Sequence, residues 1–489
     1  MTESNRLRMT WVDEATPGTT PTTPRMRTVR LTGESLAFKP EFTDSEEIRA
    51  DRMNADPIKT NESNGGGVNT EWSFPVDATP HSSWLSSLFA NPWANTPFRD
   101  NDGTADSVIT GIVASTGVIT VLTGAAFAVG HLVRLSGFGV AGNNLLARIT
   151  TGSATVPAVG AGILADEAAP PAAARLKTVG LQGASADLAA VADGITSTAL
   201  DFSTMGLAVG QWIKVGGAGA GFRFATSGCN GWARIIAISA TKLTLDNLPT
   251  GWAADAGTGK TIRVFFGDRI KNGTTMLFGT IERGFMGQSV PSYIQQSGMT
   301  VTQAQIDMKT GEKVTASYTF MGLTGKVDTV SLDATPDDAT TNGVMSAAVS
   351  VARISQSGSP VIGPNFVKSL SLKVNNNGRS IDAIRGDGKF GPSGINFGDV
   401  GVEVDLETYF GSSTAYADYL AGVPTNVSAV VVKSGQATIF TVPRLTRTDG
   451  NPNAGAKNQD VMLSFTAKAS FDPLTQAHLI LDRLEYFED

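Results

Sequence analysis

Residues 67–78 read GVNTEWSFPVDA, and residues 399–410 read DVGVEVDLETYF, with Glu403 in the place of Glu71. Apolar and polar residues alternate in these stretches, which is the pattern of a half-buried β-strand. Each stretch follows an extended run and a polar loop, and each precedes a segment with helical spacing. The order strand, long loop, strand, helix therefore occurs twice in the chain.

The two helical segments carry large side chains at matching places. In the first, Pro80 suits the first helical position, and Trp84 and Leu88 lie on one face. In the second, Tyr416 and Leu420 fall where Trp84 and Leu88 stand. We expect all four side chains to pack their helices against the core.

A β-hairpin completes each copy. Residues 299–308, the turn KTGE at 309–312 and residues 313–322 form the first, and residues 437–447 with 460–470 form the second. Val314, Ser317 and Tyr318 match a second set at residues 461, 464 and 465. We interpret this order as an internal duplication, in which residues 28–100 with 268–330 form one domain and residues 344–489 the other. Residues 1–27, rich in Pro and Thr, are expected to form an arm, and residues 331–343 a linker.

The first copy is interrupted by an insert that has a repeat of its own. Residues 128–135 (AVGHLVRL) match residues 208–215 (AVGQWIKV), and residues 147–149 match residues 233–235. We therefore expect two small all-β modules, at residues 101–185 and 186–267. An insertion of this size is tolerated where the host loop is exposed, so the modules should project from the main body. The sequence thus predicts a mainly β chain: duplicated domains, each with a short helix, and two inserted β modules.

Composition excludes several classes of protein. The 489 residues include 38 basic and 45 acidic ones, which gives a net charge of −7, and only one cysteine and three histidines. A single cysteine forms no internal disulfide, and the widely spaced histidines offer no zinc framework. No apolar run is long enough to span a membrane, and the first residues lack the apolar segment of a secretory signal. We expect no stable binding to membranes or nucleic acid.

Two glycine-rich stretches match the residue patterns of nucleotide-binding motifs but lack the structural context that those motifs require. Residues 254–261 (ADAGTGKT) fit a loose phosphate-loop pattern, and residues 137–142 (GFGVAG) fit the dinucleotide fingerprint. Those motifs require a helix to follow, whereas residues 262–268 (IRVFFGD) are typical of a strand. We predict no catalytic constellation, cofactor or metal site, and hence no enzyme.

Residues 30–36 (RLTGESL) and 44–52 (DSEEIRADR) resemble the major tail tube proteins of bacteriophages with long non-contractile tails. The resemblance implies β-sandwiches with a flanking helix, whose inner hairpins pair between subunits into a β-barrel around a channel. It implies stacked rings that enclose the tape-measure protein, conduct DNA during ejection and meet tail tip and tail terminator proteins. It also places the protein in the virion tail, assembled in the bacterial cytoplasm. Two such domains per chain favour rings of three chains over rings of six.

By motif position, the resemblance implies that the polar loop supplies contacts between stacked rings. The candidates are Glu46, Glu47, Arg49, Asp51 and Arg52, with Arg385 and Asp387 from the second copy. A solvated loop without a partner is the alternative for each of them.

Two other functions stay open on the sequence. The first is a surface-binding, adhesin-like virion protein whose inserted modules bind host carbohydrate, with Trp212, Trp232 and Trp252 as candidate contacts. The second is an enzyme that uses the inserted glycine-rich loops. We expect these tryptophans to lie in the cores of the modules, in preference to a binding surface.

Overall fold

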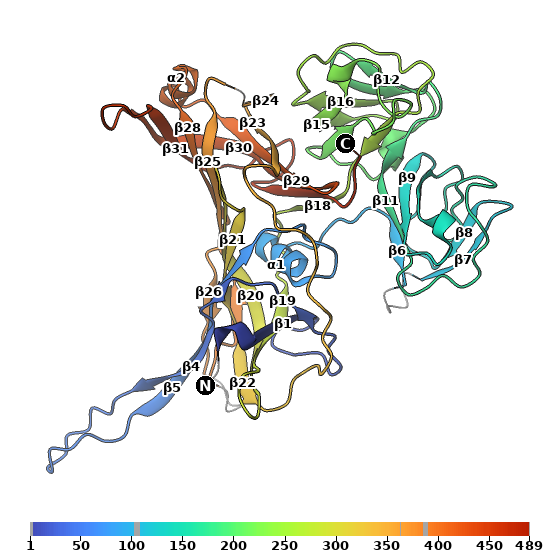
Figure 1. The fold of residues 1–489 in the computed structure, drawn as a ribbon. Helices are drawn as coiled ribbons and strands as arrows, with labels where there is room; N and C mark the ends of the chain where they lie inside the picture. Colours follow the sequence, from blue (N-terminus) through green and yellow to red (C-terminus); the bar gives the residue numbers. More distant parts are fainter. Residues whose placement is uncertain (1–2, 102–107, 362, 385–389, 489) are drawn as a thin grey trace.

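The computed structural model describes residues 3–101, 108–361, 363–384 and 390–488. Over these ranges the chain is mainly β, built from antiparallel ladders, which confirms the fold class expected from the sequence. Figure 1 shows an elongated body, a long hairpin that projects from one end of it, and a separate lobe formed by the insert.

The first copy is split by the insert. Its elements are β1 (Leu7–Glu14), β2 (Arg27–Thr28), β3 (Gly33–Glu34), β4 (Ala37–Thr43), β5 (Ile58–Glu71), α1 (Pro80–Phe89), β19 (Phe278–Phe285), β20 (Ser292–Lys309), β21 (Thr315–Met321) and β22 (Thr324–Asp328).

The second copy is continuous. Its elements are β23 (Val351–Gln356), β24 (Ser359–Pro360), β25 (Val367–Asn375), β26 (Arg379–Ile381), β27 (Gly394–Asn396), β28 (Gly401–Tyr409), α2 (Thr414–Leu420), β29 (Thr425–Lys433), β30 (Gln436–Asn453), β31 (Met462–Ala469) and β32 (Ile480–Leu484).

Both copies repeat one order of strands. In the first, β3 and β4 pair with β5, β5 with β21, and β21 with β20. In the second, β25 pairs with β28, β28 with β31, and β31 with β30. Because β20 also pairs with β25, the two halves join edge to edge in one sheet. We call this β20–β25 ladder the internal seam.

A second layer backs each half of that sheet. In the first copy β1, β19, the start of β20 and β22 pair in series, and in the second copy β23, β29, the start of β30 and β32 do the same. One hydrophobic core runs through both copies and includes Trp11, Trp72 and Trp84. Each copy is therefore a β-sandwich.

Side-chain hydrogen bonds fix how the copies correspond. Thr70 Oγ1 donates to the carbonyl of Ala316 (3.3 Å), and Thr408 Oγ1 donates to the carbonyl of Leu463 (3.4 Å). Ala316 and Leu463 are equivalent in the matched hairpins, as the sequence predicted. Residues of β5 therefore correspond to residues of β28 that lie 338 positions later.

This register corrects the alignment made from the sequence. Glu71 corresponds to Tyr409, since Glu71 lies opposite Thr315 and Tyr409 opposite Met462. The earlier match with Glu403 was wrong by six residues. An even shift leaves every side chain on its expected face, so alternation alone does not reveal it.

The expected N-terminal arm is also corrected. Residues 7–14 form β1, which pairs with β19 along its whole length, and Met9 and Trp11 are each 1% exposed. Only the Pro/Thr-rich part of residues 1–27 lacks a long strand. The expected linker packs as well: the carbonyl of Asp337 accepts a hydrogen bond from Thr28 N (3.0 Å), and Met345 beyond it is buried.

The two helices differ in burial. Trp84 and Leu88 are buried where α1 contacts β20 and β1, as expected. The expectation is wrong for Leu420, which is 68% exposed, because α2 packs mainly on β30 and contacts Phe465 of β31 through Tyr419, while Leu420 lies outside these contacts. Tyr416 is partly buried and contacts Tyr419, its neighbour on the same helix.

The insert forms a lobe of short strands. These are β6 (Phe98–Asp100), β7 (Ile109–Val113), β8 (Val118–Val121), β9 (His131–Ser136), β10 (Leu146–Arg148), β11 (Arg175–Gln182), β12 (Leu188–Val191), β13 (Gly194–Ser197), β14 (Trp212–Val215), β15 (Gly231–Ile238), β16 (Lys242–Asp246) and β17 (Arg263–Phe265), and β18 (Asp268–Lys271) then leads back to the body.

The insert contains two hydrophobic cores, one within residues 109–176 and one within residues 181–266. They share strand β11, which pairs with β9 and with β17, so the modules are joined in one sheet. Their internal repeat extends to side chains: Ala128 N donates to His131 Nδ1, and Ala208 N donates to Gln211 Oε1, both at 3.0 Å.

Candidate assembly surfaces

One face of the joined sheet is polar and hollowed. A hollow of about 580 Å³ lies over the internal seam, where Gln303, Gln305, Lys373 and Glu403 line it. Alternate residues of the same strands, such as Leu372, point into the core instead. The alternation that buries one face therefore leaves a continuous polar surface on the other.

Several charges on this face form ion pairs. Lys373 Nζ lies 3.2 Å from Glu403 and 2.6 Å from Asp405. Its hydrogen bond to Asp405, with a smaller contribution from the one to Glu403, raises the pKa of Lys373. Lys368 lies 3.3 Å from Glu407. Although the whole chain is acidic, this surface carries both signs of charge.

The sheet has two open edges. Residues 33–43, which form β3 and β4, pair with β5 on one side, and residues 446–453 of β30 pair with β31 on one side. Within the described ranges no strand pairs with their other side. We call these the first and second outer edges. Unpaired backbone N–H and C=O groups make such edges templates for another chain.

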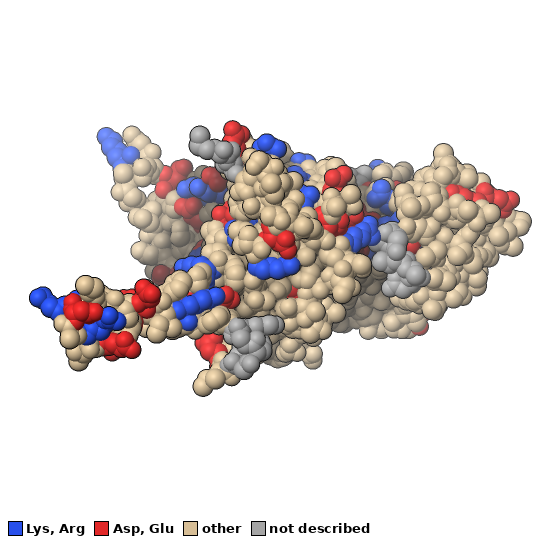
Figure 2. Space-filling model, turned by 90° about the horizontal axis from the view of Figure 1, so that it is seen from below, with Lys and Arg blue, Asp and Glu red and all other residues tan. Residues whose placement is uncertain are grey.

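Both copies present a hairpin at the same end of the body. The hairpin β4–β5, with residues 44–57 at its tip, is the long projection in Figure 1. The hairpin β26–β27 lies beside its base, where Lys59 Nζ is 4.3 Å from the ring of Phe390. Figure 2 shows charged side chains of both signs gathered at the end of the long hairpin, while the visible face of the insert carries few.

The stacking candidates of the first copy all lie at this tip and are exposed; they are Glu46, Glu47, Arg49, Asp51 and Arg52. The second-copy candidates Arg385 and Asp387 lie outside the described residues.

An ion pair shapes the tip. Arg49 Nη2 and Asp51 Oδ2 are 2.7 Å apart. The hydrogen bond from Arg49, with a further one from Met53 N, lowers the pKa of Asp51. Arg52 N donates to the carbonyl of Arg49 (3.2 Å) and adopts a φ of 58°. Arg49 and Asp51 therefore bond to each other and define the turn.

Sequence reasoning missed the apolar residues of the two tips. Ile48 is 102% exposed and Met53 68%, while Ile384, the counterpart of Ile48, is 107% exposed. The signal was present in the matching runs Ile-Arg-Ala-Asp and Ile-Arg-Gly-Asp. Each copy holds an isoleucine fully in solvent at the same position.

The insert is anchored to the body by a buried ionic network. Asp268 lies 2.8 Å from Lys177 and 3.0 Å from Arg483, and all three side chains are 2–3% exposed. Burial would raise the pKa of Asp77, but Lys177, Arg483 and Arg175 lower it to about 2. The network connects β11 of the insert with β18 and β32 of the body. The lobe therefore projects, as expected, from a fixed joint.

The three tryptophans of the insert are structural. Trp212 is fully buried, and its Nε1 donates to Thr441 Oγ1 of the second copy (2.9 Å). Trp232 is 8% exposed and packs against Phe487, and Trp252 Nε1 donates to the carbonyl of Val191 (2.7 Å). Burial removes Trp212 and Trp232 as candidate carbohydrate contacts, whereas Trp252 packs on the core of the second module and is partly exposed.

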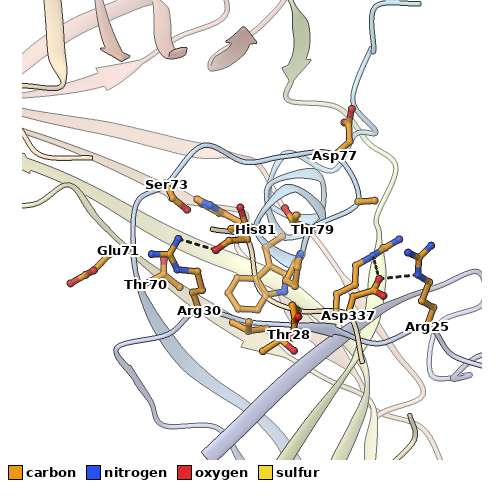
Figure 3. Close-up of a pocket in the computed structure, with 17 residues that line it drawn as sticks. Arg25, Thr28, Arg30, Thr70, Glu71, Ser73, Asp77, Thr79, His81 and Asp337 are labelled. Atoms are coloured by element: carbon orange, nitrogen blue, oxygen red, sulfur yellow. Dashed lines mark hydrogen bonds and ion pairs between the residues drawn. The ribbon is translucent and has the colours of Figure 1, made fainter. Parts of the chain in front are cut away.

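A pocket of about 230 Å³ lies at the start of α1 (Figure 3). Its polar groups bond to one another: Arg25 lies 2.8 Å from Asp337, and Arg30 donates to two backbone carbonyls. His81 Nε2 lies 2.8 Å from the hydroxyl of Tyr318, and burial lowers the pKa of His81 to about 4. The pocket is thus held by internal pairs in which His81 is neutral at pH 7.

In the described ranges no group of three or more His, Cys, Asp or Glu side chains is arranged to hold a metal ion. None of the helices found there has the length and hydropathy needed to cross a membrane.

Comparison with protein families agrees with the architecture. The model of a family described as phage tail tube protein matches residues 4–469, from the short turn of helix before β1 to the end of β31. A comparison with curated proteins gave no match. Since the family match covers nearly the whole sequence, this chain belongs to the phage tail tube protein family.

Proposed function

We propose that this protein polymerises into stacked rings that form the hollow tube of a long non-contractile phage tail. Family membership makes it a structural component of the virion tail that assembles into a tube. The single observation that supports a ring is the internal seam, where the two sandwich copies of one chain pair edge to edge. The same two kinds of edge stay open at the two ends of the joined sheet. Adding chains at those edges closes a ring and removes every open edge.

Each ring contains three chains. Residues 28–100 with 268–330 form one tube domain and residues 344–489 the other, so three chains place six equivalent domains around the channel. Six chains per ring would double this number and widen the channel.

The hollowed polar face lines the channel. Its paired charges, such as Lys373 with Asp405, leave few free cations to hold a phosphate backbone. Such a surface suits a conduit that encloses the tape-measure protein and later releases DNA without binding it stably. The channel wall is structural, and the protein has no enzymatic role.

The hairpin tips dock on the next ring. Ile48 and Ile384 supply exposed apolar contact, while the Arg49–Asp51 pair sets the shape of the first tip. Replacement of Ile48 and Ile384 by Asp should yield free rings or shortened tubes, whereas tubes of normal length would contradict this docking. Arg49→Ala with Asp51→Ala should shorten tubes less. The ends of the stack meet the tail tip and tail terminator proteins, and assembly takes place in the bacterial cytoplasm.

Electron cryo-microscopy of the purified protein and of virions tests the proposal. Hollow tubes built from threefold rings support it. The protein found at a tail tip or on the capsid, with a different chain forming the tube, would favour the adhesin-like reading. A glycan-binding screen of the full chain would then follow.

A further inference from the structure

The internal seam shows which backbone groups join two tube copies. Asn376 N donates to the carbonyl of Thr302 (2.9 Å), and Thr310 N donates to the carbonyl of Lys368 (3.0 Å). In an antiparallel ladder such bonded positions alternate. Even-numbered residues of β20 and β25 therefore bond across the seam, while odd-numbered ones bond to the outer neighbours.

Each outer edge has an equivalent in that seam. In both hairpins the register shifts at one residue, Thr302 in the first copy and Thr448 in the second. These threonines donate to the equivalent carbonyls of Thr319 (3.2 Å) and Thr466 (3.3 Å). The second outer edge thus corresponds to β20 with an offset of 146 residues.

The first outer edge corresponds to β25. Glu34 lies opposite Val68 and Leu370 opposite Leu406, and Val68 and Leu406 are equivalent. The offset is therefore 336 residues. Ser35 N donates to the carbonyl of Gly67 (2.8 Å), so odd-numbered residues of this edge bond to β5. The backbone N–H and C=O groups of the even-numbered residues therefore point away from β5, and in β25 the even-numbered residues likewise bond across the internal seam.

We propose that the second outer edge of one chain pairs with the first outer edge of the next in the register of the internal seam. This rests on the proposed ring and specifies its contacts. The facing residues are Asp449 with Lys39, Gly450 with Phe38, Asn451 with Ala37, and Pro452 with Leu36.

Charge supports this register. Asp449 and Lys39 take the places of Gln303 and Asn375, which face each other in the internal seam and line the hollow. Both side chains are exposed, and within the described ranges the only bond found for either is the hydrogen bond that Asp449 Oδ1 accepts from Gly450 N (2.8 Å). The register places these opposite charges side by side on the channel face.

Backbone chemistry supports it as well. Pro452 faces outward and has no N–H to give to the residue opposite. That residue, Leu36, has a carbonyl that already accepts from Arg283 Nη1 (2.7 Å) and an N–H that already donates to Glu34 Oε2 (2.6 Å). Pro452, which has no N–H, therefore lies opposite Leu36, whose outward-pointing backbone N–H and C=O are already hydrogen-bonded within the chain.

Cysteine pairs test the register in assembled tubes. Lys39→Cys with Asp449→Cys places two sulfurs at a non-bonded pair, where Cα atoms lie about 4.5 Å apart, within the range of a disulfide. Mild oxidation should give covalent species up to closed trimers on a denaturing gel. Gln303→Cys with Asn375→Cys is the matched control and should bond within one chain.

The outcomes distinguish an error in the proposed register from an error in the proposed function as a tube. Tubes in which Lys39→Cys bonds with Asn451→Cys, and not with Asp449→Cys, would overturn the register and keep the proposed function. A wild-type protein that forms no ring in virions would overturn both. If the cysteine variants fail to assemble, charge reversal decides: Lys39→Asp should weaken assembly and Asp449→Lys should restore it. Failure of this exchange to restore assembly contradicts the pairing.

Discussion

The internal seam and the outer edges are built from equivalent residues but differ in hydrogen-bonding capacity. Where the seam has Asn376 and Ile306, the outer edges have Pro40 and Pro452. Both prolines face outward, so each removes a donor that the internal seam retains. A seam within one chain forms during folding, whereas an edge exposed before assembly must resist pairing with wrong partners. In the proposed ring, this difference separates an interface formed during folding from one formed during assembly.

The largest expected effect comes from a charge placed in either interface. Val374 is buried in the internal seam, and its equivalent Phe38 is half-buried at the outer edge. Val374→Asp should lower the free energy of unfolding by about 3–5 kcal/mol, because an unpaired carboxylate is buried. Phe38→Asp should lower the free energy of unfolding by only about 1–2 kcal/mol, because Phe38 is half-buried. It should nevertheless prevent rings from forming.

Thermal unfolding of the unassembled chain, together with negative-stain images of assembly, distinguishes these variants. Equal loss of stability in both would contradict the division between a folding interface and an assembly interface.

The insert offers a second comparison between repeats, with an effect that depends on pH. Burial lowers the pKa of His131 to about 4, against 6.5 for the free side chain. The unfolded chain therefore binds more protons below pH 6.5. The stability from neutral His131 is present above pH 6.5 and is lost as the pH falls towards 4, by about 3 kcal/mol in total.

Gln211, the equivalent of His131, supplies the matched substitution. His131 accepts from Ala128 N, and its Nε2 lies 3.2 Å from the carbonyl of Met205. A glutamine can make both bonds without titrating. His131→Gln should unfold at nearly the wild-type temperature at pH 7 and at a higher one at pH 4. Burial raises the pKa of Asp482 to about 6. Because Asp482 is present in both the wild type and His131→Gln, its effect on the pH dependence cancels in the comparison. Equal acid sensitivity would exclude His131 as the source.

A smaller effect is expected from restoring the missing donors. Pro40→Asn introduces the residue found at the equivalent seam position, with an N–H that faces Thr448 of the next chain. One added hydrogen bond contributes about 0.5–1.5 kcal/mol, which corresponds to a roughly two- to tenfold lower concentration for assembly. Pro452→Ile should help less, because the carbonyl of Leu36 is already bonded.

Sedimentation or light scattering against protein concentration measures this threshold. The reverse change, Asn376→Pro, should destabilise the folded chain itself by removing the bond to Thr302. An unchanged threshold in Pro40→Asn would contradict the assigned register.

Sequence patterns predicted the strands and their faces but not their alignment. Alternation in residues 67–78 and 399–410 predicted half-buried strands, in which Val68 and Leu406 are buried, and the turn at residues 309–312 was correct. Glu71 was matched six residues away from its true counterpart, because a pattern of period two is unchanged by an even shift. The strand ladders and the threonine hydrogen bonds, which the sequence does not display, fix the offset.

Burial by distant segments was also beyond local patterns. Trp84 and Leu420 share helical spacing, yet only α1 has β1 and β20 to cover it. Trp212 was compatible with an exposed binding surface until the second copy supplied Thr441 as its partner. The loop charges lie at the exposed hairpin tip, where Arg49 and Asp51 pair with each other and the neighbouring Ile48 is fully exposed.

The smallest expected effect distinguishes the interfaces by one hydroxyl. Thr302 is buried beside the internal seam and Thr448 is exposed beside the second outer edge, although both donate to equivalent carbonyls. Thr302→Val should cost about 1 kcal/mol in the free chain, and Thr448→Val less than about 0.5 kcal/mol, since water replaces an exposed bond. In assembled tubes the neighbouring chain covers Thr448, so the two costs should converge. Guanidinium unfolding of free chains and heat dissociation of tubes measure both. If Thr448→Val remains neutral in tubes, the second outer edge stays open to water and the seam between chains lies elsewhere.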